Sequence, residues 1–449
     1  MQEASTYDVI IRNGTLYDGL GHPPVGGDLA ITGDIITAIG ELNQARGRHE
    51  IDAAEMAVAP GFINMLSWAN QSLIEDGRSQ SDIRQGVTLE VMGEGWSMGP
   101  LTDLMKAEMV ERQAHIRFDV EWSTLGEYLE FLEQRGISTN VASFVGAATA
   151  RIHELGYEDR TPTTAELERM RDLVRQAMEE GAMGLSSALI YPPGCYAQTE
   201  ELVALAEVVA EHGGLYISHI RNEGRQLTEA LEELIETARR AKVPAEVYHL
   251  KAAGQQNWPK LDDVIARIEA ARAEGLRITA DMYTYPASST GLGATMPPWV
   301  QEGGHQAWIS RLKDQSIRKR VKVEMSSPSD EWDSTFLACG SAENVVLVRF
   351  RSQSLRHLVG KTLADVAAGR GQSPEETAMD LVIEDDSNVG CVFFTMSEEN
   401  VRRQVALPWM SFGSDGASMT LDTLIDQYRE ARSCDSSRET HLAWWSSRF

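Results

Sequence analysis

The feature that most constrains the fold of this 449-residue chain is a regular alternation of short apolar segments with longer amphipathic ones between residues 60 and 290. Segments such as MGLSSALIY and LYISHI have the length of buried strands, and TAELERMRDLVRQAMEEGA carries apolar residues at helical spacing. Strands and helices that alternate in this way form a parallel sheet with the helices outside. Six or seven such units favour an α/β fold of the closed (β/α)8, TIM-like barrel type over an open sheet.

The segments on either side of this alternation follow other patterns. Residues 1–60 contain short alternating runs with turn signals at Asn13-Gly14 and Gly33-Asp34, which predict a small antiparallel, sandwich-like β-unit. Residues 291–345 are rich in proline and in loop-forming residues, which predicts an inserted lid or subdomain.

The barrel is therefore expected in two parts, residues 61–290 and residues 346–418. Residues 419–449 are rich in Arg, Ser and Trp and show no barrel-like pattern. We expect an aberrant or truncated C-terminus, and a barrel that is incomplete at that end.

Charge and composition exclude several classes of partner. The net charge of −26 disfavours nucleic acids and anionic membranes, because both require basic patches. No apolar run is long enough for a transmembrane helix, and the polar start lacks a signal-peptide core. A cytoplasmic location is expected, unless an upstream signal peptide has been removed. Four widely spaced cysteines without a CxxC pair predict neither a zinc ribbon nor a disulfide framework. The oligomeric state is left open.

Titratable residues gather where the barrel strands are expected to end, which is where barrels carry their chemistry. These residues are Glu94, His219, Arg221, His249, Lys251, Tyr283, Tyr285 and Asp415. Each has a structural explanation of its own, since a histidine can be a hydrogen-bonded core residue and Asp415 can form a turn before glycine. Two histidines and a carboxylate, however, make a three-ligand site for Zn²⁺ with one position left for water. The metal would lower the pKa of that water towards ~7, and Asp415 could take its proton.

The motifs, taken in order, resemble the amidohydrolase superfamily, in particular its N-acyl-D-amino-acid deacylase (D-aminoacylase) branch. The opening YDVIIRNGTLYDG and the segment VAPGFI resemble the family's N-terminal β-unit and its entry to the barrel. SHIRNEG and YHLKAAG resemble the two metal-histidine strands, and SFGSDG resembles the catalytic aspartate strand. The resemblance covers about nine-tenths of the chain.

The resemblance implies a set of roles. It implies one zinc ion held by Glu94, His219 and His249, with Glu94 standing where the family has a cysteine. It also implies Asp415 as general acid and base, and Arg221 as the group that binds the α-carboxylate of the substrate. The remaining implied residues are Tyr285 (or Tyr283) near the reacting carbonyl, Lys251 close by, and Tyr283, Ser288 and Ser289 around the substrate.

One departure from the family pattern concerns a second metal. After PGFI the superfamily usually has Asp-x-His-x-His, whereas this chain has Asn64-Met65-Leu66-Ser67-Trp68. Leucine and tryptophan cannot ligate a metal, and no lysine follows the fourth strand to form a bridging carbamate. One zinc ion is expected, with the second position lost.

The expected function is a zinc-dependent amide hydrolase that removes the acyl group from small N-acyl-amino acids. The D configuration of the substrate comes from the resemblance alone. Two alternatives remain open: an impaired or inactive homologue that acts at most as a binding protein, and a cyclic amide hydrolase of the dihydropyrimidinase or dihydroorotase type. A nucleophilic role for Cys195 is a third, weaker reading, because no histidine lies close to it in sequence.

Overall fold

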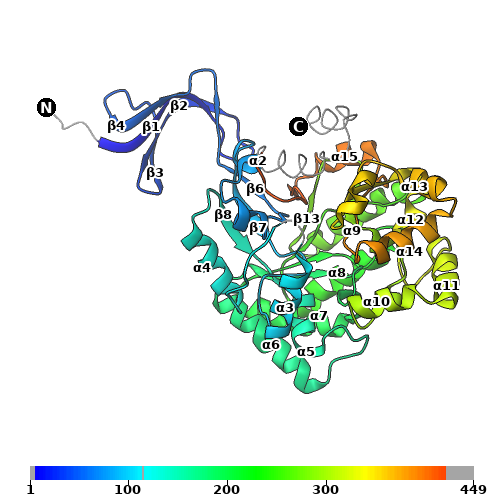
Figure 1. Cartoon of the computed structure of the whole chain (residues 1–449). Helices are drawn as coiled ribbons and strands as arrows, with labels where there is room; N and C mark the ends of the chain where they lie inside the picture. Colours follow the sequence, from blue (N-terminus) through cyan, green and yellow to red (C-terminus); the bar gives the residue numbers. More distant parts are fainter. Residues whose placement is uncertain (1–5, 114–115, 421–449) are drawn as a thin grey trace. The chain divides into compact units, whose positions relative to one another are not determined.

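The computed structural model describes residues 6–113 and 116–420. The chain divides into two compact units, Met1–Phe62 and Ile63–Phe449 (Figure 1). Most of the tail expected to be aberrant, residues 421–449, lies outside the described residues. No described helix combines the length and apolar character needed to cross a membrane.

The N-terminal unit contains one mixed five-stranded sheet in the order β3-β2-β1-β4, with β5 also beside β1. Its strands are β1 (Thr6–Leu16), β2 (Val25–Thr32), β3 (Ile35–Gly40), β4 (Arg46–Asp52) and β5 (Ala57–Val58). Gly33-Asp34 connects β2 to β3, as predicted. The hairpin predicted at Asn13-Gly14 is wrong, because both residues lie inside β1, where its register with β2 shifts. The Asn13 backbone is left-handed (φ 59°) and its side-chain amide donates to Asp52 Oδ1, so the strand bulges and continues.

The second unit is a (β/α)8 barrel, as predicted. Among the described residues its strand ring consists, in order, of β6 (Phe62–Asn64), β7 (Val87–Met92), β8 (Asn140–Ser143) with β9 (Val145–Gly146), β10 (Gly184–Ala188), β11 (Leu215–His219), β12 (Ala245–Val247), β13 (Ile278–Met282) and β17 (Met410–Phe412). The pair β7–β8 and the successive pairs from β9 to β17 are parallel.

The ring closes on both sides of β6. The Met65 N–H donates to Phe412 O, and the Ser414 N–H donates to Leu66 O. β8 and β9 are consecutive in the chain, and they pair with β7 and β10 respectively, so they join the two arcs of the ring. The strand ring is therefore complete in the described part of the chain. The expected incompleteness concerns the chain after about residue 418, most of which lies outside the described residues.

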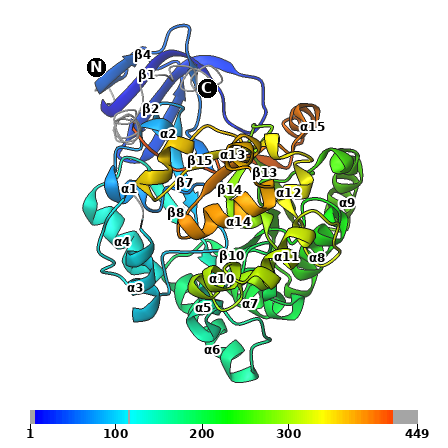
Figure 2. The same ribbon diagram turned by 45° about the vertical axis from the view of Figure 1, so that its right-hand side comes forward.

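Helices surround this ring (Figures 1 and 2). They are α1 (Ser72–Glu75), α2 (Gln80–Ile83), α3 (Asp103–Arg112), α4 (Leu125–Arg135), α5 (Ala147–Leu155), α6 (Thr164–Glu179), α7 (Thr199–Glu211), α8 (Leu227–Ala241) and α9 (Leu261–Ala273), with the short 3₁₀ helices η1 (Gly194–Tyr196) and η2 (Gln255–Lys260). Capping boxes begin α4 and α6, where Thr124 pairs with Glu127 and Thr163 with Glu166. Apolar faces of these helices pack on the strands and form the largest core of the molecule.

A long insertion separates β13 from β17. It contains β14 (Ser288–Gly291), η3 (Leu292–Thr295), η4 (Pro298–Gln301), α10 (His305–Leu312), α11 (Gln315–Met325), α12 (Thr335–Ala338), η5 (Ala342–Asn344), β15 (Val345–Arg349), η6 (Gln353–Leu358), α13 (Leu363–Arg370), α14 (Pro374–Glu384), β16 (Gly390–Phe393) and α15 (Glu398–Gln404). The strands β14, β16 and β15 pair antiparallel. A separate apolar core runs from Leu292 to Phe393, so the insertion extends well past residue 345, where the lid was expected to end.

Candidate metal centre

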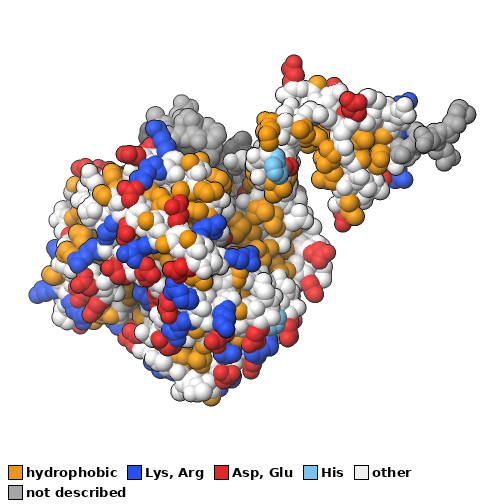
Figure 3. All heavy atoms as spheres, turned by 180° about the vertical axis from the view of Figure 1, so that it is seen from behind, with side chains coloured by type: hydrophobic (Ala, Val, Ile, Leu, Met, Phe, Trp, Pro, Cys, Tyr) orange, Lys and Arg blue, Asp and Glu red, His pale blue; other side chains and the backbone are white. Residues whose placement is uncertain are grey.

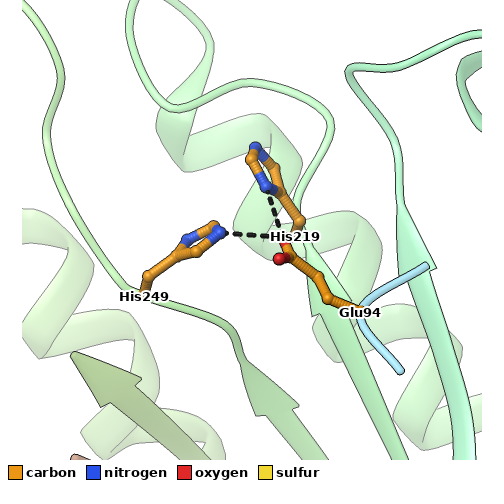
Figure 4. Close-up of side chains that lie close together, drawn as sticks. All are labelled: Glu94, His219 and His249. Carbon is orange, nitrogen blue, oxygen red and sulfur yellow. Dashed lines mark hydrogen bonds and ion pairs between the residues drawn. The ribbon is translucent and has the colours of Figure 1, made fainter. Parts of the chain in front are cut away.

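Three side chains converge at the ends of barrel strands. Glu94 follows β7, His219 ends β11 and His249 follows β12. The Glu94 Oε1 atom lies 2.9 Å from His219 Nδ1 and 3.0 Å from His249 Nε2 (Figure 4). All three side chains are buried, and their possible ligand atoms lie within 4.8 Å of one another. The three residues that the sequence predicts as zinc ligands are therefore brought together in space.

Local backbone geometry directs these side chains inward. Gly93 and Gly95 flank Glu94 with positive φ angles of 101° and 63°. A Cβ atom on Gly95 would stand 2.4 Å from the Ala188 Cβ, so only glycine allows this turn to approach β10. His249 is itself left-handed (φ 32°), and its N–H donates to the buried carboxylate of Asp281 (2.9 Å). Such a conformation costs ~1–3 kcal/mol in a non-glycine residue and is typical of functional sites.

The electrostatics of the cluster favour a positive charge between the donors. Burial alone would raise the pKa of Glu94, but the charge of His249 and the hydrogen bonds from both imidazoles outweigh it, so the pKa lies below its ordinary value. Burial and Lys251 lower the pKa of His249, but Glu94 and Glu223 outweigh them and raise it to about 10. Burial lowers the pKa of His219.

Glu223 belongs to this cluster and was not singled out from the sequence. Its Oε1 atom lies 2.5 Å from Lys251 Nζ, 3.2 Å from His249 Nδ1 and 3.5 Å from His219 Nε2. It therefore faces the ring nitrogens that point away from Glu94. A carboxylate in this position fixes the tautomer and orientation of metal-binding histidines. The available signal was its place in SHIRNEG, four residues after His219.

Asp415 lines the same cavity as these ligands. The indole N–H of Trp68 donates to Asp415 Oδ1 (3.0 Å) and to Glu94 Oε2 (3.1 Å). Asp415 is left-handed (φ 47°). Burial and the nearby charge of Glu94 raise its pKa to about 6.

A cavity of about 830 Å³ opens over the cluster. Lys251, Tyr283, Ser288 and Ser289 line it, as do the cluster residues, Trp68 and Asp415. The Tyr283 hydroxyl is buried and has no hydrogen-bond partner among the described residues, and Lys251 Nζ lies 5.5 Å from the centre of its ring. Burial raises the pKa of Tyr283 well above its usual value, so the phenol stays protonated and can donate.

Tyr285, predicted to lie near the reacting carbonyl, is oriented differently. Its hydroxyl donates to Ser414 O (3.1 Å), and the residue is not among those that line the cavity. Of the two tyrosines, Tyr283 is the one that faces the cluster.

Arg221, predicted to bind the substrate carboxylate, also lies elsewhere. Its guanidinium pairs with Glu233 and donates to the carbonyls of Cys195 and Ala197. It lines a smaller adjoining cavity of about 190 Å³, which shares Tyr191, Thr290 and Asp333 with the larger one. Of the described residues that line the larger cavity, the arginines and lysines are Arg112, Lys251 and Arg349. Cys195 lies beside Arg221, and burial raises the pKa of its thiol to about 12, which disfavours a nucleophilic role.

Comparisons with known proteins identify the family of the chain. No family model matches the chain. D-aminoacylase of Alcaligenes xylosoxydans xylosoxydans is 29% identical over 418 residues, which are 92% of this chain and 75% of that protein. N-acyl-D-glutamate deacylase of the same organism is 30% identical over 410 residues, which are 91% of this chain and 74% of that protein. The chain belongs to the D-aminoacylase family of amidohydrolases.

Two solved structures of this family are also similar. The N-acyl-D-glutamate deacylase of Bordetella bronchiseptica, in complex with zinc and a phosphonate that mimics the tetrahedral intermediate, superposes with a TM-score of 0.74. It is 29% identical, and the match covers 92% of this chain and 76% of that one. A D-aminoacylase with a binuclear metal centre, described by one-metal activation and second-metal attenuation, gives a TM-score of 0.73 at 28% identity, over 91% of this chain and 76% of that one.

Proposed function

We propose that this chain is a metal-dependent amide hydrolase that removes the acyl group from N-acyl-D-amino acids. The observation that carries the proposal is the convergence of Glu94, His219 and His249 with Asp415 in one cavity, in a member of this family. The D configuration rests on the substrates named for the two Alcaligenes relatives.

The donor set fits one zinc ion. Glu94 Oε1, His219 Nδ1 and His249 Nε2 would hold it, and Glu223 lies behind the rings, 3.2 Å from His249 Nδ1 and 3.5 Å from His219 Nε2. A zinc ion there supplies Lewis-acid chemistry, because it polarises a carbonyl and acidifies water. The described cluster offers oxygen and nitrogen donors and no sulfur, so it is a harder ligand set, in the sense of hard and soft metal ligands, than a site that contains cysteine.

Asp415 acts as the proton carrier in the proposed reaction. With a pKa near 6 it is mostly ionised at pH 7, and the Trp68 indole occupies only its Oδ1 atom. It accepts the proton of the water whose oxygen bonds to the amide carbon. It returns that proton to the nitrogen as the C–N bond breaks, which yields a free carboxylic acid and a free amino acid.

Tyr283 and the cationic side chains bind the substrate. The Tyr283 hydroxyl, buried and without a hydrogen-bond partner among the described residues, donates to the carbonyl oxygen as negative charge develops on it. Lys251 and Arg349 offer positive charge to the substrate carboxylate, and Ser288 and Ser289 line the same cavity from β14.

The test is hydrolysis of a panel of N-acetyl-D-amino acids, with their L-enantiomers and a cyclic amide such as dihydrouracil as comparisons. We expect release of the D-amino acid in the presence of zinc and loss of activity after chelation. Asp415→Asn should keep its zinc and lose activity by about 10²–10⁴-fold. Turnover of the cyclic amide alone would redirect the assignment to cyclic amide hydrolysis. A zinc-loaded chain that hydrolyses none of these substrates would contradict the proposal.

A further inference from the structure

Trp68 occupies the strand end where the superfamily usually carries metal-binding histidines. Its backbone N–H donates to Gly416 O, and the preceding Ser67 N–H donates to Val91 O, so the main chain is held on both sides of β6. The indole lines the cavity and is 41% exposed. Its Nε1 atom is nevertheless engaged, because it lies 3.1 Å from Glu94 Oε2 and 3.0 Å from Asp415 Oδ1.

Two carboxylates, one from each strand that flanks β6, therefore accept from the same indole N–H. Glu94 follows β7 and Asp415 follows β17. Two carboxylates that converge on one point repel each other unless something positive lies between them. Here that role falls to the positive end of a neutral indole dipole, since tryptophan is a donor only.

We propose that the indole N–H of Trp68 takes the place of a second metal ion, binding Glu94 Oε2 and Asp415 Oδ1, and so makes this a one-metal site with a fixed Asp415. The inference rests on the proposed function for its effect on activity, but not for its effect on metal content. Trp68 is a positioning residue, since it touches the ligand Glu94 and the proton carrier Asp415 rather than the reacting atoms.

Leu66 supports the same conclusion. It is buried in the barrel interior against the apolar cluster that contains Val91, Phe144, Ile217 and Tyr248. Leu66, at the position of the first histidine of the missing His-x-His pair, is thus part of the apolar core. Trp68, at the position of the second, donates a hydrogen bond. Neither position leaves a ligand for a cation, and the two carboxylate oxygens that face it already accept a hydrogen bond.

In the similar D-aminoacylase with a binuclear centre, one metal ion activates the enzyme and a second attenuates it. In this chain we expect excess zinc to leave the rate unchanged, because the position of an attenuating metal is filled. The first measurement is therefore zinc content after equilibrium dialysis, together with the rate as free zinc is raised. The expected result is one zinc per chain and a flat response. Two tightly bound zinc ions per native chain would overturn the inference.

Substitutions at Trp68 test the two parts of the proposal separately, namely the exclusion of a second metal ion and the positioning of Asp415. Trp68→His offers an imidazole beside the two carboxylates, and we expect it to bind a second zinc and to be inhibited by excess zinc. Trp68→Phe keeps the ring and removes the N–H. We expect it to keep one zinc, to lose about 10–100-fold in kcat and to change KM less than about threefold, because a misplaced catalytic group acts on the chemical step.

Trp299→Phe is the matched control. It also removes an indole N–H that donates to a carboxylate, Glu324 Oε2 at 2.6 Å, but in the insertion and outside the cavity. We expect native kcat and native zinc content. Equal losses in Trp299→Phe and Trp68→Phe would overturn the positioning role. If the native chain hydrolyses no substrate, the proposed function fails, and the zinc contents of native chain and Trp68→His still decide the inference.

Discussion

Each imidazole of the cluster lies between two carboxylates. Glu94 contacts the ring nitrogens that face the cavity, and Glu223 faces the opposite nitrogens of both rings. The outer carboxylate lies closer to His249 Nδ1 (3.2 Å) than to His219 Nε2 (3.5 Å), which has no hydrogen-bond partner among the described residues. Lys251 balances the charge of Glu223 at 2.5 Å. Burial would raise the pKa of Glu223, but Lys251 and the two histidines outweigh it and lower the pKa, so the carboxylate remains ionised.

The first prediction at the scale of single residues concerns Glu223. Glu223→Gln keeps the shape but removes the charge that faces His219 and His249, so we expect zinc affinity to fall about 10–100-fold. Competition with a chromogenic chelator measures it without reference to activity. Glu233→Gln is the control, because Glu233 pairs with Arg221 away from the cluster. Unchanged zinc affinity in Glu223→Gln would remove its supporting role.

The second prediction is a pH dependence set by Asp415. Its carboxylate must be ionised to accept a proton, so kcat/KM should fall tenfold per unit of pH below the pKa of Asp415, which lies at about 6 in the metal-free protein. A bound cation lowers this pKa, so the acidic limb should appear at or below pH 6. The Trp68 hydrogen bond also lowers the pKa, and Trp68→Phe should therefore move the limb to higher pH. A pH profile of kcat/KM for both chains is the measurement, and an acidic limb well above pH 6 in the native chain would exclude Asp415 as its source.

At the scale of elements, strand ends explain which site residues the sequence could predict. Glu94, His219 and His249 end or directly follow barrel strands, and the alternation of strands and helices locates such positions. Arg221 lies two residues beyond the end of β11, as Glu94 and His249 do beyond β7 and β12, so its position relative to a strand does not set it apart. Its direction depends on Glu233 and on the carbonyls of Cys195 and Ala197, contacts that local sequence does not reveal. Glu223 lies four residues beyond β11, in the loop before α8.

The secondary-structure elements also divide into those that local sequence predicts and those that depend on tertiary contacts. The barrel strands and helices follow from hydrophobic periodicity, which depends on local sequence. The choice between Tyr283 and Tyr285 depends on the loop after β13, and the extent of the insertion depends on which helices share a core. Asn13-Gly14 carries a hairpin signal, but the Asn13 backbone N–H donates to Asp28 on β2 and its side-chain amide donates to Asp52 on β4, so tertiary contacts override the local preference.

The third prediction concerns the turn that carries Glu94. Gly95→Ala places a Cβ against Ala188 at 2.4 Å, and we expect a loss of about 1–3 kcal/mol from overpacking together with weaker zinc binding. Gly136→Ala also replaces a glycine with a positive φ, 81°, but its Cβ would meet nothing within 4 Å. This variant should lose only the ~1–2 kcal/mol of stability that a positive φ costs a non-glycine residue, and it should keep native zinc affinity. Urea unfolding and chelator competition measure the two effects, and equal zinc affinity in both variants would show that the turn does not position Glu94.

At the scale of the whole molecule, the two units differ in how much apolar surface they bury. The N-terminal sheet buries only a few apolar side chains, among them Ile10 and Ala30, whereas Ile35, Ile36 and Ile39 are each more than half exposed. Figure 3 shows apolar side chains gathered over this unit. The barrel unit, in contrast, contains three extended apolar clusters. A small unit with few buried apolar groups has little stability of its own.

The last prediction follows from where the metal ligands lie. Glu94, His219 and His249 all belong to the unit Ile63–Phe449, and a ligand stabilises only the native state that binds it. Zinc at about 100 times its Kd should add about 2.7 kcal/mol to the stability of that unit and nothing to that of Met1–Phe62. Calorimetry with zinc and with a chelator should therefore show a zinc-dependent major transition, with any transition of the N-terminal sheet unchanged and at lower temperature. His249→Ala should abolish the zinc shift. An equal shift in that variant would mean that zinc stabilises the chain through some other site.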